Sequence, residues 1–149
     1  MELQLISNTS RYKQCLYSIL FLCCISNSSL AQNDETISLD NGVKFYEAEK
    51  FQQAREVFEY LVKEDAENSI YYHWLGKSYG RIAENAAWLT AMSMAKKTRK
   101  AFEKAVELDE TNLDALKDLK QYYLDAPGFL GGSKRKANDL QIKIDSLYE

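Results

Sequence analysis

The chain has 149 residues, which is enough for one domain and too few for two of ordinary size. Hydrophobic residues make up 46% and charged residues 28%, a globular balance that excludes a wholly disordered chain. The net charge of −3 lacks the basic excess typical of nucleic-acid-binding proteins, so we expect no nucleic-acid partner. A single proline and six glycines leave few helix breakers, which favours an all-helical fold.

Residues 1–31 have the three parts of a secretory signal peptide. A basic stretch precedes an apolar run at 15–25, and Ser29 and Ala31 are spaced like the small residues before a cleavage site. The run is shorter than the about 20 residues that span a bilayer, and a buried core helix is the less favoured alternative. We therefore predict an exported protein, periplasmic or secreted, whose mature domain is 32–149 and does not contact the membrane after cleavage.

All three cysteines, Cys15, Cys23 and Cys24, lie in the predicted signal peptide. Acylation of Cys23 or Cys24, as in a lipoprotein, is less favoured because neither follows a small residue. The mature chain therefore has no thiol and no disulfide framework. Its only histidine, His73, cannot make an ordinary zinc site alone. No nucleophile–base arrangement is recognisable, so we expect no metal, no cofactor and no enzymatic activity.

Two stretches with apolar residues at helical spacing follow a polar lead-in. The first begins at Leu39 and the second runs from Phe51 to Val62, with only residues 48–50 between them. Helices joined by so short a link must lie antiparallel, so we predict a helical hairpin. Turn-forming residues at 64–69 end this hairpin.

A second hairpin is predicted from Ile70 to Leu108. Gly76 lies inside its first helix, where glycine costs about 1 kcal/mol against alanine, so we expect a neighbouring element to approach the backbone there. The connection is predicted at 84–90, with Thr90 as the N-cap of the second helix.

The inserted segment of this hairpin, at 84–94, carries four large apolar residues, and a basic stretch follows it on the second helix. The apolar residues are expected in the core, with an adaptable exposed patch as the alternative; they are Trp88, Leu89, Met92 and Met94. The basic residues are expected to form a solvated face, with an acidic surface or lipid headgroups as the alternative partner; they are Lys96, Lys97, Arg99 and Lys100.

The third hairpin begins at Leu113 and is interrupted by a glycine-rich loop before the last helix. We favour a structural loop that turns the chain, closes the hairpin end with two apolar side chains and caps the last helix with Ser133. Anion binding by backbone N–H groups is an alternative, although the segment lacks phosphate-loop spacing, and protein docking on the apolar pair stays open. The loop residues are Pro127, Gly128, Phe129, Leu130, Gly131, Gly132 and Ser133.

Two motifs resemble the tetratricopeptide repeat, a helical hairpin of 34 residues. Leu75, Gly76 and Tyr79 match its L-G-x-x-Y motif, and Ala54 and Phe58 match its A-x-x-x-F motif. The tryptophan and the proline of the repeat signature are absent. The resemblance implies an all-α solenoid of three stacked antiparallel hairpins. Its repeats would be 35–68, 69–112 and 113–149, with extra residues at 84–94 and 126–133.

The loop motif A-P-G-x-x-G-G resembles a subgroup of exported bacterial tetratricopeptide proteins, and the chain is more loosely similar to regulator of microtubule dynamics proteins. The resemblance implies that the first helices of the repeats line a peptide-binding groove. A cationic patch within it could hold a carboxylate, and a solvated polar face is the equal alternative. The predicted groove residues are Tyr46, His73, Lys77, Arg81, Lys117 and Gln121, and the patch consists of Lys77, Arg81 and Lys117.

The leading hypothesis is an exported, non-enzymatic module that binds a protein or peptide as a scaffold or adaptor in the cell envelope, as a monomer or small oligomer. One alternative is an anion-binding or accessory enzymatic role at the loop 127–133. The other is a structural subunit of an envelope assembly.

Overall fold

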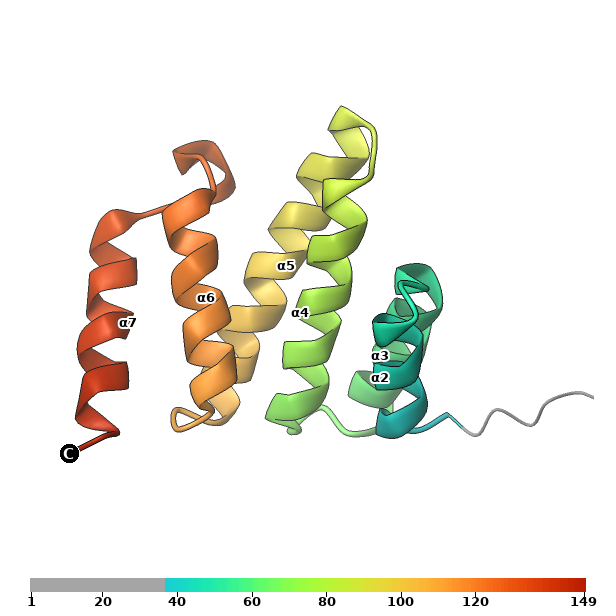
Figure 1. Cartoon of the computed structure of the whole chain (residues 1–149), viewed down its shortest axis with the longest axis horizontal. Coiled ribbons are helices and arrows are strands. Elements are labelled where there is room, and N and C mark those ends of the chain that lie inside the picture. The colour runs from blue at the N-terminus through green and yellow to red at the C-terminus, as the bar shows by residue number, and fades with distance from the viewer. Residues whose placement is uncertain (1–36) are drawn as a thin grey trace, which may run out of the picture. The chain divides into compact units, whose positions relative to one another are not determined.

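The computed structural model describes residues 37–149, which contain six α-helices, one short 3-10 helix and no strand (Figure 1). This confirms the predicted all-helical class and the expected number of helices. The predicted signal peptide with its three cysteines and the first two residues of the first predicted repeat lie outside the described residues. The elements are α2 (Leu39–Glu47), α3 (Phe51–Glu64), α4 (Ser69–Glu84), α5 (Trp88–Leu108), α6 (Leu113–Asp125), η1 (Gly128–Leu130) and α7 (Lys134–Ser146).

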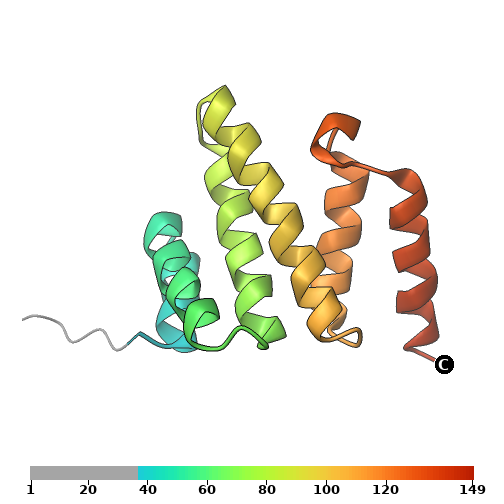
Figure 2. The same ribbon diagram turned by 180° about the vertical axis from the view of Figure 1, so that it is seen from behind.

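Consecutive helices pack against each other as three hairpins, α2–α3, α4–α5 and α6–α7. In Figure 1, α4 and α6 stand in front of α5, and the reverse view brings α3 and α5 to the front (Figure 2). The first helices of the hairpins therefore share one face of this unit. Among residues 37–149, no helix is both long enough and apolar enough to cross a membrane.

Polar side chains cap the N-terminus of each hairpin's first helix and of α7. Each cap accepts a hydrogen bond from a backbone N–H that the helix itself leaves without a partner. Ser133 does so for Lys136 at 3.3 Å, which confirms the predicted N-cap of the last helix. The other capping residues are Ser38, Asn68 and Asn112.

The predicted connection between α4 and α5 is wrong in position and length. α4 continues to Glu84 and α5 begins at Trp88, so Thr90 lies inside α5 instead of capping it. The extra residues of the second hairpin therefore lengthen its two helices. Residues 88–100 contain neither glycine nor proline, so nothing in the local sequence delays the start of α5.

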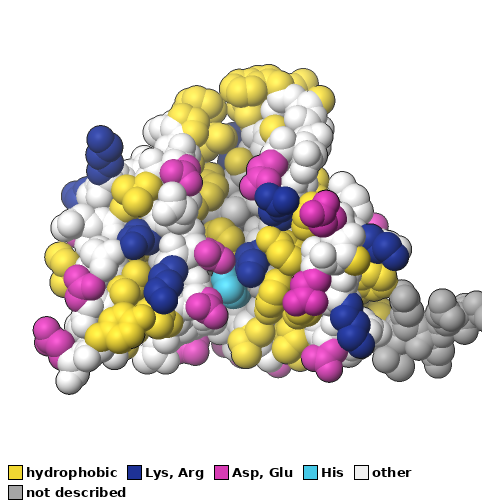
Figure 3. All heavy atoms as spheres, in the orientation of Figure 1, with side chains coloured by type: hydrophobic (Ala, Val, Ile, Leu, Met, Phe, Trp, Pro, Cys, Tyr) yellow, Lys and Arg dark blue, Asp and Glu magenta, His cyan; other side chains and the backbone are white. Residues whose placement is uncertain are grey.

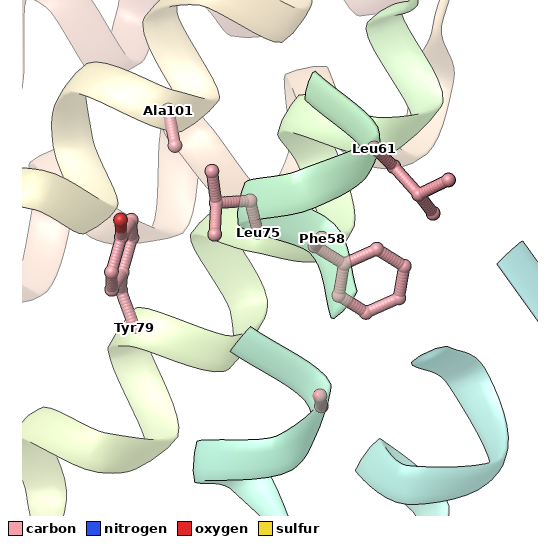
Figure 4. Packing of buried hydrophobic residues seen from close by; sticks show 6 residues of the cluster. Phe58, Leu61, Leu75, Tyr79 and Ala101 are labelled. Carbon is pink, nitrogen blue, oxygen red and sulfur yellow. The ribbon is translucent and has the colours of Figure 1, made fainter. Parts of the chain in front are cut away.

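The core lies between the hairpins. In the cluster shown in Figure 4, Phe58 and Leu61 come from α3, Leu75 and Tyr79 from α4, and Ala101 from α5. A second cluster joins α5 to the third hairpin and contains Phe102, Leu119, Tyr123 and Ala137. Each hairpin thus buries its apolar face against its neighbour, as expected for stacked units too small to fold alone.

Two glycines allow an aromatic ring to lie against a helix backbone. A Cβ on Gly42 would lie 2.5 Å from the nearest ring carbon of Phe58, and a Cβ on Gly76 would lie 2.5 Å from that of Phe102. The close approach predicted at Gly76 is therefore confirmed. In the third hairpin, Lys120 and Gln141 occupy the corresponding places, and the Lys120 ammonium donates to the Gln141 carbonyl at 2.7 Å.

Four residues form a set of contacts where the first hairpin meets the second. The Tyr79 hydroxyl on α4 donates to the Glu59 carboxylate on α3 at 2.7 Å, and Arg55 lies one helical turn from Glu59 with their charged groups 3.8 Å apart. The Lys97 ammonium lies 5.2 Å from the centre of the Tyr79 ring. Burial raises the pKa of Tyr79 most, and the hydrogen bond to Glu59 raises it further.

The same four residue types recur between the second and third hairpins. The Tyr123 hydroxyl donates to Glu103 at 2.7 Å, and Arg99 donates to Glu103 at 2.9 Å. The Lys136 ammonium lies 5.0 Å from the centre of the Tyr123 ring. Burial and the Glu103 hydrogen bond likewise raise the pKa of Tyr123. Neighbouring hairpins are therefore joined by one repeated contact pattern.

Candidate peptide-binding groove

A continuous groove runs between α4 and α6, and Tyr46 from α2 reaches its edge. An upper cavity of about 410 Å³ and a lower cavity of about 570 Å³ share Lys77 and Asp118 in their walls. All six predicted groove residues line it: Tyr46, Arg81 and Gln121 the upper cavity, His73 and Lys117 the lower one, and Lys77 both. The structure thus brings together the residues that the sequence singled out.

The upper cavity has a largely apolar floor. Phe102 from α5, Tyr122 from α6 and Leu130 from η1 contribute to it. Burial raises the pKa values of Tyr46 and Tyr122, so both phenols stay neutral at physiological pH. A floor of this kind can accept an apolar side chain of a ligand.

His73 lies at the floor of the lower cavity and is only 6% exposed. Its Nε2 lies 2.8 Å from a carboxylate oxygen of Asp118, whose side chain is 41% exposed. A carboxylate only accepts hydrogen bonds, so Nε2 carries a proton and donates it. The pair joins α4 to α6 across the groove, and Figure 3 shows the one histidine in cyan among magenta acidic and dark blue basic side chains.

The three residues of the predicted cationic patch are divided between the two cavities, and Lys77 lines both. The Lys77 ammonium lies 4.1 Å from the centre of the Trp74 ring and 5.2 Å from that of Tyr46. The Arg81 guanidinium lies 5.0 Å from the centre of the Phe51 ring and pairs with Glu84. Aromatic faces therefore hold both α4 cations at the groove wall.

The α6 wall is mostly acidic, which the predicted cationic patch does not include. Asp118 and Asp125 line the upper cavity, and Asp114 lines the lower one beside Lys117. Asp118 follows Asp114 by four residues and Asp125 follows Asp118 by seven, so the three lie along one side of a helix, a signal readable from the sequence. The groove therefore has an α4 wall with Lys77 and Arg81, the latter paired with Glu84, that faces a mostly acidic α6 wall.

Four backbone N–H groups of the glycine-rich loop donate to carbonyls of the loop or of α6. The N–H groups of Leu130 and Gly132 donate to the Pro127 carbonyl, that of Gly131 to Gly128, and that of Ser133 to Tyr123. An N–H group that already donates to a carbonyl is unavailable to an anion. These bonds weigh against the anion-binding alternative and favour the structural one. Leu130 is half-buried in the groove, whereas Phe129 is 63% exposed.

The core placement predicted for the start of α5 is wrong for two of its four apolar residues. Trp88 is 67% exposed and Leu89 is 79% exposed. Met92 is half-buried, and Met94 packs against the first core cluster. The α4–α5 hairpin projects beyond α3 and α6, so its tip is largely uncovered (Figure 1).

Comparisons of the sequence with protein-family models and curated proteins, and of the structure with solved structures, gave no match. Among residues 37–149, no group of three or more histidine, cysteine, aspartate or glutamate side chains could hold a metal ion.

Proposed function

We propose that the groove between α4 and α6 binds a segment of a partner polypeptide, and that the protein acts as a scaffold or adaptor without enzymatic activity of its own. The observation that carries this proposal is the continuous hollow between two helices, with an apolar upper floor and charged walls. Such a concave surface offers depth to apolar side chains and fixed charges to polar ones.

The two walls suggest the chemistry of the bound segment. Lys77 and Arg81 on α4 favour acidic side chains or a carboxylate, and Asp118 and Asp125 on α6 favour basic side chains. A segment that carries both signs on opposite edges, with an apolar residue between them, would match the upper cavity. This proposal extends the predicted carboxylate site to a two-sided site.

The site of action that we propose is the cell envelope. Its support is the sequence pattern at 1–31, which would carry the chain across a membrane before cleavage. We also propose that the hairpins are tetratricopeptide-like repeats. The recurring glycine–phenylalanine and tyrosine–glutamate contacts, which fall at equivalent places in neighbouring hairpins, support this relationship.

Site-specific photocrosslinking in the host tests the groove. A photoreactive amino acid replaces Gln121, which lines the upper cavity and is exposed, or Gln53, which is exposed on α3 outside the groove. We expect crosslinks to a polypeptide from position 121 and not from position 53. The double variant Lys77→Ala/Arg81→Ala should weaken crosslinking about tenfold, because charge-assisted contacts are lost. Lys63→Ala, an exposed change on α3, is the matched control.

The outcomes separate the alternatives. Crosslinks of equal strength from positions 53 and 121 would indicate a structural subunit enclosed by its assembly, and an absence of crosslinks from position 121 would remove the groove proposal. Phosphate-dependent thermal stabilisation that the Lys77→Ala/Arg81→Ala variant retains would favour the loop alternative instead. Thermal unfolding of each variant controls for folding, since Lys77 and Arg81 also stack on aromatic rings.

A further inference from the structure

Three large apolar side chains are exposed at one end of the described unit, on two segments far apart in sequence. Trp88 and Leu89 form the tip of the α4–α5 hairpin, and Phe129 lies on η1. The ring centres of Trp88 and Phe129 are 6.5 Å apart, so the two tips meet. Hydrophobic atoms cover both projections at the top of the space-filling view (Figure 3). We call Trp88, Leu89 and Phe129 the apolar tip.

All charged residues in the two segments that carry the apolar tip are basic. Residues 85–102 and 126–138 contain no aspartate or glutamate. The remaining described residues have almost twice as many acidic as basic side chains, so the charge is strongly segregated. The basic residues of the two segments are Lys96, Lys97, Arg99, Lys100, Lys134, Arg135 and Lys136.

Three of these cations, at positions 134–136, occupy the first turn of α7, which contains no acidic residue. The helix dipole makes cations unfavourable at an N-terminus. All three residues are exposed; Arg135 lies 3.6 Å from Asp139 and Lys136 lies 3.7 Å from Glu103. An anionic partner beside these cations would offset their unfavourable interaction with the helix dipole.

We propose that the apolar tip docks on an anionic lipid bilayer, with Trp88, Leu89 and Phe129 in the headgroup–acyl boundary and the surrounding cations near lipid phosphates. Aromatic side chains favour this boundary. A projecting tip inserts into a deformable surface, whereas a protein partner would need a matching cavity. The inference departs from the expectation of no membrane contact after cleavage, and it rests on Trp88 and Leu89, which were expected in the core and are exposed.

The distances along α5 fit this arrangement. Lys96 lies eight residues after Trp88, which is about 12 Å along the helix axis. If the apolar tip enters about 5–10 Å, as surface-bound apolar faces do, Lys96 and Lys97 come within a Debye length of the lipid charges. The proposal is independent of the groove, whose occupant would lie between α4 and α6.

Quenching of Trp88 by brominated lipids tests the proposal. The apolar run at 15–25 could itself bind lipid, so retention of the full chain on vesicles is not a sufficient readout. The fluorescence of Trp88 is obtained as the difference between the wild-type chain and Trp88→Phe, which leaves only Trp74. We expect this difference signal to be quenched by brominated vesicles that contain phosphatidylglycerol and not by brominated vesicles of phosphatidylcholine alone.

Three variants sharpen the test. Leu89→Ser/Phe129→Ser should lower the vesicle affinity measured through Trp88 about tenfold or more, because apolar burial is lost. Ile142→Ser, at a residue of similar exposure (62%) on α7, should leave it unchanged. Lys134→Gln/Arg135→Gln should weaken binding and reduce its dependence on salt.

Three results would overturn the inference: a Trp88 signal that anionic vesicles do not quench, equal quenching by neutral vesicles, or equal affinity in Leu89→Ser/Phe129→Ser and wild type. If the wild-type chain instead bound polyglutamate through the apolar tip and ignored vesicles, an acidic protein would replace the bilayer as partner. Because all three residues of the apolar tip are exposed, thermal unfolding should confirm that every variant folds.

Discussion

The ring of Phe102 lies directly against the backbone of Gly76, so closely that a Cβ on Gly76 would lie 2.5 Å from two ring carbons. Gly42 and Phe58 repeat this relationship in the first hairpin. Because one residue of each pair is a glycine without a side chain, the ring of the other fills the space between two antiparallel helices. In the third hairpin a hydrogen bond between Lys120 and Gln141 takes this place. The helices of that hairpin are thus joined by a polar contact where the others use a buried ring.

Gly76→Ala should destabilise the protein, whereas Gly80→Ala in the same helix should stabilise it. Alanine gains about 1 kcal/mol of helix propensity at both positions. At Gly76 overpacking against Phe102 costs about 1–3 kcal/mol and outweighs that gain. At Gly80 the nearest atom, a Thr98 methyl carbon, would be 3.7 Å away, which is an ordinary contact. Urea unfolding of both variants measures the difference, and equal shifts would contradict the packing at Gly76.

Asp118→Ala should destabilise the protein by about 1–3 kcal/mol, because it leaves the buried Nε2–H of His73 without its acceptor. Asp118→Asn keeps an acceptor oxygen and should cost less. Asp114→Ala, which removes an exposed carboxylate from the first turn of the same helix, is the control and should cost only about 0.3–1 kcal/mol of helix-dipole interaction. Equal stability of all three variants in urea unfolding would mean that the His73–Asp118 bond contributes nothing to the fold.

Stability should fall with rising pH above about 10, the ordinary pKa of a tyrosine. Burial and the bonds to Glu59 and Glu103 raise the folded-state pKa values of Tyr79 and Tyr123. The folded state then holds protons that the unfolded state releases. Its stabilisation is complete below the unfolded pKa and is lost as the pH rises toward the folded one, by about 1.4 kcal/mol per pH unit for each tyrosine.

The double variant Tyr79→Phe/Tyr123→Phe should be less stable at pH 7, because two hydrogen bonds are lost, but its stability should fall less steeply from pH 9.5 to 11. Urea unfolding across this range compares the slopes. Tyr60→Phe, an exposed change on α3, should keep the wild-type slope. A double variant with the wild-type slope would show that these phenols do not govern alkaline unfolding.

The hairpins, the close approach at Gly76 and the cap at Ser133 were predictable because residue types in the local sequence indicate each of them. Periodicity marks the apolar face of a helix, and turn chemistry marks its ends. The six groove residues followed from the register of the resemblance. Their assembly in one groove agrees with that register without testing family membership.

The exposure of Trp88 and Leu89 was not predictable in this way. An apolar residue is buried only if another element covers it, and α4 and α5 continue past the neighbouring helices (Figure 1). Periodicity carries no information about how far a neighbour extends. Asp118 was missed for another reason, since its place in the groove depends on its contact with His73, which joins α4 to α6.

The three glycines of the loop should differ sharply in their tolerance of alanine. A Cβ on Gly132 would overlap the backbone carbonyl of Ala126, which cannot move without breaking the loop. Gly131 has a φ of +98° and would also push against Arg99, so alanine there costs about 1–3 kcal/mol of strain. Gly128 has nothing within 4 Å of its Cβ position and should accept alanine with little change. Thermal unfolding should therefore rank the losses as Gly132→Ala largest, Gly131→Ala intermediate and Gly128→Ala smallest. A Gly132→Ala variant as stable as Gly128→Ala would contradict the loop conformation, and with it the structural role that places Leu130 in the groove.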